Sequence, residues 1–154
     1  MNLFEDIEYE HELFDAAAGS LVTMVQNYTS GNIKDADNDE IIDHIKTLIK
    51  FFINHMIEFH TKKEEEVLFE ALKNLHLPLD KGPLYYYKLE HDEHLKHLHM
   101  ILTLIDLPLT GDDSKKALID VTHVFCGEVW EHIDKENSVL LTEATERIRG
   151  NNLM

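Results

Sequence analysis

The sequence is poor in cysteine and in basic residues. A single cysteine, Cys126, occurs in 154 residues, so no disulfide can form within the chain and a reducing compartment, the cytoplasm, is expected. The 14 Lys and Arg residues stand against 30 Asp and Glu, which gives a net charge of -16. Nucleic acids and anionic membrane surfaces bind through positive charge, so we expect neither as a partner.

Long apolar runs, proline and glycine are also scarce. No uninterrupted apolar stretch reaches the roughly 18 residues of a membrane span, and the acidic start MNLFEDIEYEHE is unlike a signal peptide. With three prolines and six glycines, most of the chain contains no helix breaker. Histidine, by contrast, is abundant, with 11 residues.

Apolar residues recur at helical spacing along most of the chain. The four expected helices cover about residues 3–29, 39–76, 83–107 and 114–149. Asn2 and Glu5 have the spacing of a capping box at the first helix start. Pro83 suits the first turn of the third helix, and Gly150 suits the end of the fourth. This pattern predicts one all-α domain over residues 1–154, an up-down-up-down antiparallel four-helix bundle.

One sequence pattern occurs twice. Residues 60–72 read HTKKEEEVLFEAL and residues 132–144 read HIDKENSVLLTEA, so both copies begin His-x-x-Lys-Glu and continue to Val-Leu. The copies fall on the second and fourth expected helices. In an up-down-up-down bundle these two helices run parallel and lie on a diagonal. The chain therefore reads as two helical hairpins of the same plan.

Each copy places a histidine and a glutamate one helical turn apart on the same face. The pairs are His60 with Glu64 and His132 with Glu136. Both pairs continue an apolar stripe and are therefore expected to face the core. Buried carboxylates cost several kcal/mol unless a positive charge compensates them. No lysine or arginine shares these stripes, so the repeat predicts a pair of bound metal dications rather than two exposed surface pairs.

The same helical periodicity predicts which neighbouring side chains are buried and which face solvent. The buried stripes are expected to include Phe59, Val67 and Val139. The charged residues beside the first pair are interpreted as solvent-facing: Lys62, Lys63, Glu65 and Glu66.

The first and third helices are expected to supply further ligands. His11 is the only histidine of the first helix and lies at core spacing between Ile7 and Phe14. On the third helix, His91 is favoured because the EHD around it repeats the EHE around His11, and His94 is the alternate or an additional ligand. His97 and His99 are expected to point away from the buried stripe of the third helix. The remaining histidines are interpreted as surface or packing residues: His44, His55, His76 and His123.

These motifs resemble the hemerythrin-like family, also called the HHE cation-binding domain. The resemblance rests on EHELF, HTKKEEEVLF, EHDEH and HIDKENSVL, which occur in family order over almost the whole chain. It implies two non-heme iron ions joined by an oxo or hydroxo bridge inside the bundle. Glu64 and Glu136 would bridge the irons. The histidines completing the site would come from His11, His60, His91, His94 and His132.

The sequence departs from the oxygen-carrying members of that family at two positions. Those carriers pair two histidines four residues apart on the third helix, where this chain has Tyr87 before His91. They also use a bridging aspartate five residues after the last histidine, where Glu136 follows His132 by four. A ferritin-like di-iron centre is disfavoured, because Glu-x-x-His occurs only once in the chain, ending at His11.

Three functions follow from this resemblance. The chain could bind O2 or nitric oxide reversibly, or it could be a di-iron oxidoreductase that removes peroxide or nitric oxide. It could also buffer iron or bind a protein partner. For the first two functions the small molecule is expected to act at the metal. Cys126 is expected to be inert, and the protein is expected to be a monomer or small oligomer.

Overall fold

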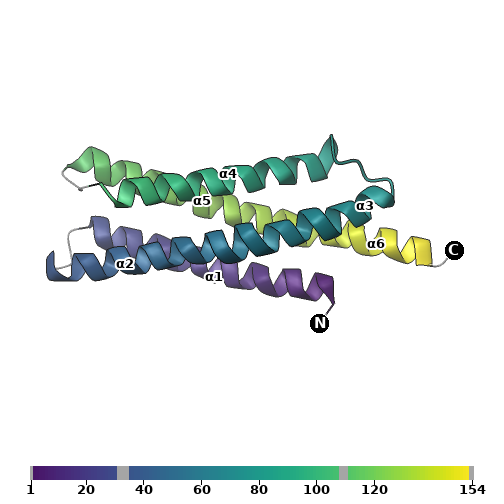
Figure 1. Ribbon diagram of the computed structural model, residues 1–154, viewed down its shortest axis with the longest axis horizontal. Coiled ribbons are helices and arrows are strands. Elements are labelled where there is room, and N and C mark those ends of the chain that lie inside the picture. The colour runs from purple at the N-terminus through teal and green to yellow at the C-terminus, as the bar shows by residue number, and fades with distance from the viewer. Residues whose placement is uncertain (1, 31–34, 108–110, 153–154) are drawn as a thin grey trace.

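A computed structural model describes residues 2–30, 35–107 and 111–152 of the chain. Every regular element in these ranges is helical, and the all-α expectation is confirmed (Figure 1). The elements in chain order are α1 (Leu3–Thr29), α2 (Asp35–Phe51), η1 (Phe52–Thr61), η2 (Glu64–Phe69), α3 (Glu70–Asn74), α4 (Gly82–Ile105), α5 (Asp112–Lys135), η3 (Glu136–Leu140) and α6 (Leu141–Asn152). The η elements are π-helical turns within longer helices.

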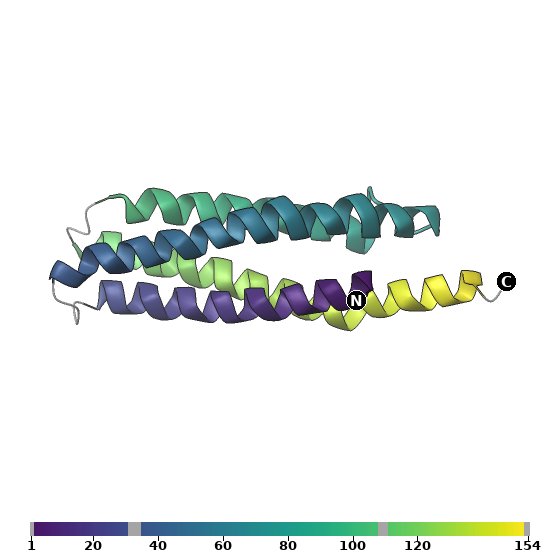
Figure 2. The same ribbon diagram turned by 60° about the horizontal axis from the view of Figure 1, so that its bottom comes forward.

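These elements form four long rods. We call α2 through α3 the second rod and α5 through α6 the fourth rod; α1 and α4 are the first and third. Figures 1 and 2 show the rods side by side with alternating direction, which confirms the four-helix bundle. The first rod packs against α5 and α2, and the third packs against α5 and η1. The second and fourth rods therefore lie on the diagonal. None of the described helices has an apolar stretch long enough to cross a membrane.

Helix ends follow local chemistry with two exceptions. The Asn2 side chain accepts a hydrogen bond of 2.9 Å from the backbone N–H of Glu5, so the capping box is present. Pro83 lies in the first turn of α4, as expected. The second rod begins at Asp35 rather than near residue 39; the prediction placed the start too late because the first turn has no large apolar residue to mark it. The fourth rod continues through Gly150, since one glycine costs a helix only about 1 kcal/mol.

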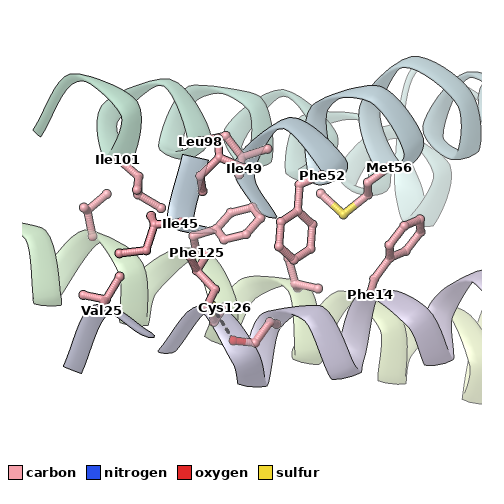
Figure 3. Close-up of a cluster of buried hydrophobic side chains, with 14 of the residues drawn as sticks. Phe14, Val25, Ile45, Ile49, Phe52, Met56, Leu98, Ile101, Phe125 and Cys126 are labelled. Atoms are coloured by element: carbon pink, nitrogen blue, oxygen red, sulfur yellow. Dashed lines mark hydrogen bonds between the residues drawn. The ribbon is translucent and has the colours of Figure 1, made fainter. Parts of the chain in front are cut away.

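Two apolar clusters fill the bundle. The larger one contains Phe52 and Phe125, whose ring centroids lie 5.1 Å apart (Figure 3). Cys126 is buried in it, its thiol donates to a backbone carbonyl 3.4 Å away, and burial raises its pKa to about 12. The larger cluster extends toward the C-terminal end of α1, and the smaller cluster, which includes Ile7 and Leu68, lies toward the opposite end of the bundle. The two expected metal-binding pairs lie between these clusters.

The π-helical turns set which side chains of the second rod are buried. One series of buried positions recurs every four residues: Phe52, Met56, His60, Glu64, Leu68 and Leu72. An ideal α-helix would rotate such a series by about 40° at each step, and the wider π turns remove this drift. The expected burial of Phe59 and Val67 is therefore wrong, because they are 58% and 51% exposed. Val139, in η3, is exposed for the same reason.

Candidate metal centre

Six buried side chains from all four rods meet between the apolar clusters. They form two groups of four, and within each group one ligand atom of every residue lies within 4.8 Å of the others. The first group is His11, His60, Glu64 and Glu136, and the second is Glu64, His91, His132 and Glu136. Both glutamates belong to both groups and have no exposed surface.

Each glutamate contacts a histidine of its own rod. The distance from His60 Nε2 to Glu64 Oε1 is 3.0 Å, and that from His132 Nε2 to Glu136 Oε1 is 3.1 Å. The π-helical turns η2 and η3 begin at these two glutamates. The repeated His-x-x-x-Glu motif thus places one imidazole and one carboxylate of each diagonal rod at the same level of the bundle.

Each glutamate also contacts a histidine of the other hairpin. His11 Nε2 lies 3.0 Å from Glu136 Oε1, and His91 Nε2 lies 3.5 Å from Glu64 Oε1. The arrangement has an approximate two-fold symmetry. The α1 histidine of the first hairpin contacts the glutamate of the second, and the α4 histidine of the second hairpin contacts the glutamate of the first. The two hairpins are therefore held together through the cluster as well as through apolar packing.

The opposite ring nitrogen, Nδ1, of each of these histidines faces an oxygen acceptor. The pairs are His11 with Asn137 at 2.7 Å, His60 with Glu10 at 3.4 Å, His91 with Glu65 at 3.3 Å, and His132 with Glu90. A metal-bound histidine commonly donates its second N–H to such an oxygen, which fixes the ring and its tautomer. All four rings therefore direct Nε2 toward the two glutamates.

The lysine of each His-x-x-Lys-Glu motif binds the glutamate that faces the histidine of the same motif. Lys63 binds Glu10, and Lys135 binds Glu90 at 2.9 Å. The interpretation of Lys63 and Glu65 as solvent-facing charge is therefore wrong. Both side chains turn toward partners on neighbouring rods, which the sequence of one helix does not reveal.

Buried polar atoms without a hydrogen bond test whether a cation fits the cluster. Among the described residues, such atoms occur only here: His11 Nε2, His60 Nδ1, His94 Nε2, and both carboxylate oxygens of Glu64 and Glu136. The carboxylates of Glu64 and Glu136 have histidine Nε2 atoms beside them, at 3.0 to 3.5 Å, and burying such groups without full hydrogen bonding costs free energy that a bound cation would offset. Imidazole and carboxylate donors together suit iron and other first-row metals. The donor set therefore fits a metal site.

The buried glutamates and histidines of the cluster shift one another's pKa values. Burial alone would lower the pKa of His60 and His132, but Glu64 and Glu136 outweigh it and raise both to about 9. The pKa of His91 rises to about 10, again because Glu64 opposes the effect of burial. The pKa of Glu64 falls well below its usual value despite burial, chiefly through His60. The two buried glutamates thus stabilise positive charge on the histidines around them.

Two further side chains of α4 border the cluster. His94 is 2% exposed, and its ring centroid lies 5.1 Å from that of His132. Burial and the charges on His132 and His91 hold its pKa well below the usual value, so it is a neutral base. Tyr87 packs edge-on against His132, and burial, with Glu136, raises its pKa to about 12. Both His91 and His94 are therefore buried at the site, and His91 alone of the two belongs to a four-residue group.

The other histidines lie outside the cluster. His97 Nδ1 pairs with Glu128 at 2.8 Å on the outer side of α4 and α5. The remaining ones are exposed: His44, His55, His76, His99 and His123.

Sequence reasoning did not identify the outer acceptors Glu10, Glu90 and Asn137. A signal was present for the first two, because a Glu-His dipeptide occurs at Glu10 and again at Glu90. In both hairpins this glutamate faces the histidine of the His-x-x-Lys-Glu motif and binds its lysine. The repeat therefore includes the Glu-His dipeptide as well.

The comparison with protein families agrees with this geometry. The sequence model of one protein family, the hemerythrin HHE cation binding domain, matches residues 2–144. A search of curated proteins and a search of solved structures each found no match. Because the match spans most of the chain, including both histidine–glutamate groups, the protein belongs to the hemerythrin HHE cation-binding domain family.

Proposed function

We propose that the cluster holds two non-heme irons and that O2, nitric oxide or peroxide is bound there. The observation that carries this proposal is the sharing of Glu64 and Glu136 by both four-residue groups. A carboxylate that belongs to two adjacent ligand groups is placed to bridge two cations. The charge on two dications would compensate the two buried glutamates.

The two metal positions would have different protein ligands. His11 and His60 would complete the first, and His91 and His132 the second. His94, a neutral base with an unpaired Nε2, is available to the second position only, because its ring lies beside His132. The first position would then retain more open coordination for an incoming small molecule.

The surroundings favour a small ligand. The cavity at the cluster is about 10 Å³, and apolar side chains of Phe14, Met56 and Val129 line it with the histidines. A volume of this size holds about one water-sized molecule, so it excludes organic substrates. A carboxylate-bridged iron pair supplies a redox-active Lewis acid to a diatomic molecule or peroxide. The chain holds the ligands, excludes bulk water and limits the size of what enters.

The test is metal content followed by spectroscopy. Purified wild-type protein is expected to hold two irons per chain and to change its visible spectrum when air, nitric oxide or peroxide is admitted. A double variant, Glu64→Ala with Glu136→Ala, is expected to retain no iron. Iron binding by the double variant equal to that of wild type contradicts the proposed centre. A reversible O2-dependent band favours storage or sensing, and rapid loss of added peroxide favours an enzyme.

A further inference from the structure

A pocket of about 250 Å³ opens between α4 and α5, on the outer side of the cluster. Four glutamates line it: Glu90, Glu93, Glu128 and Glu131. Lys135 is the only cation among the lining residues, and it is already paired with Glu90 and Glu131. Glu93 and Glu131 are 51% and 71% exposed, so the mouth of the pocket is open to solvent. Glu93 lies 3.9 Å from Lys96 and Glu128 pairs with His97, and the four glutamates still leave the mouth acidic.

The pocket ends at the metal centre. His94 and His132 line both this pocket and the small cavity at the cluster. His94 is 2% exposed, and its Nε2 has no hydrogen-bond partner. A buried imidazole with a free nitrogen, placed between an acidic mouth and a carboxylate cluster, is a ligand for a cation on its way inward.

The other hairpin provides a comparison within the same molecule. Matching His11 to His91 and His60 to His132 gives each pocket residue a counterpart on α1 or the second rod. In sequence, Glu93 and Glu131 correspond to the exposed Leu13 and Phe59, and Glu128 corresponds to the buried Met56. His94 corresponds to Phe14. The inner residues are the same in both halves, since Glu10 and Lys63 correspond to Glu90 and Lys135. The acidic mouth is therefore a feature of one side and is not required by the repeated centre.

We infer that the pocket between α4 and α5 is the route by which a divalent cation reaches the buried centre. Glu93, Glu128 and Glu131 attract the hydrated cation and supply transient oxygen ligands, and His94 receives it at the floor. The first hairpin has no glutamate at the three matching positions, so the proposed route is confined to the second hairpin. This inference rests on the proposed metal centre, but it concerns the rate of loading rather than the final occupancy.

The test measures loading with Co²⁺, whose visible bands report binding in real time. Metal-free full-length protein is mixed with Co²⁺ in a stopped-flow instrument. The variant is Glu93→Gln, Glu128→Gln, Glu131→Gln, and the control is Glu12→Gln, Glu40→Gln, Glu70→Gln, three exposed positions away from the pocket. Both triple variants lose the same net charge, so a difference between them reports the pocket. Far-UV circular dichroism verifies that each is folded.

Acidic clefts raise the rate of cation capture by about 10-fold or more. We expect the pocket variant to load about 10-fold more slowly than wild type, with a weaker dependence on salt and the same final cobalt content. The control is expected to load within about twofold of wild type. Equal loading rates in the two triple variants overturn the route alone. A lower final cobalt content in the pocket variant also overturns it, because the glutamates would then belong to the centre. Wild type that binds no cobalt or iron overturns both the route and the proposed centre.

Discussion

His94 takes the place in the second hairpin that Phe14 takes in the first. The Phe14 ring centroid lies 5.0 Å from that of His60, and the His94 centroid lies 5.1 Å from that of His132, both edge-on. The two halves of the cluster are otherwise closely matched, so this exchange makes them chemically different. One half has an additional buried nitrogen, and the other has a phenyl ring in its place.

The exchange predicts that His94→Phe weakens one metal position and spares the other. The substitution copies the packing of Phe14 but removes the nitrogen that we propose as an additional ligand at the His91 and His132 position. After loading with iron, release to a chelator is expected to become at least about 10-fold faster for one iron and to stay unchanged for the second. The control is Phe14→Leu, which changes packing without removing a ligand. Release kinetics that match wild type for both irons contradict a ligand role for His94.

Glu90 is expected to matter for metal affinity although it lies outside both four-residue groups. It accepts the Nδ1–H of His132, is held by Lys135, and has a pKa lowered to about 2, because these two partners outweigh the effect of burial. Removing such an outer carboxylate typically costs 10- to 100-fold in affinity. We expect Glu90→Ala to weaken iron binding by about that factor, and Glu90→Gln, which keeps an acceptor, to weaken it less. Competition with a coloured chelator measures both, with Glu12→Ala as the exposed control.

Much of the fold and the inner site could be predicted because helical periodicity is local information. Apolar spacing located the rods, and the spacing of His60 with Glu64 and of His132 with Glu136 located the inner carboxylates. Both His91 and His94 lie on the buried stripe of α4, which runs in steps of three and four residues. Periodicity alone therefore could not choose between them.

The rest depends on geometry that a single helix does not encode. Lys63 and Glu65 have the composition of a solvated face, and their partners Glu10 and His91 lie on other rods. The register change at η1 and η2 also escaped the prediction, which assumed a uniform 100° per residue. The signal available in the sequence was the spacing of four residues that places Met56 and Leu68 on either side of the His60 and Glu64 pair.

The raised histidine pKa values predict how the metal-free protein responds to pH. His60 and His132 have pKa values of about 9, and His91 of about 10, against an ordinary value of 6.5. The folded chain therefore binds these protons more tightly than the unfolded chain, and the resulting stability is complete below pH 6.5 and lost as pH rises toward 9 or 10. In the presence of a chelator, thermal unfolding is expected at a lower temperature at pH 9 than at pH 6.5.

A matched variant isolates the cause of this pH response. Glu64 contributes to raising the pKa of both His60 and His91, so Glu64→Gln is expected to flatten the dependence of the unfolding temperature on pH. The substitution keeps the size of the side chain and its helix propensity. An equally steep decline in Glu64→Gln, or a rise in stability toward pH 9 in the unmodified chain, contradicts the assignment.

Phe52 and Phe59 test the register set by the π-helical turns. Phe52 is fully buried between Phe125 and Met56, whereas Phe59, seven residues later, is 58% exposed (Figure 3). Phe52→Ala is expected to lower the free energy of unfolding by about 3–5 kcal/mol, because it leaves a cavity in the larger cluster. Phe59→Ala removes the same atoms from a surface ring that Lys63 overlies at 4.8 Å, so its expected cost is about 1 kcal/mol or less. Urea unfolding of the metal-free variants measures both values. Equal costs would mean that an unbroken α-helical register, with Phe59 facing the core, describes the second rod better.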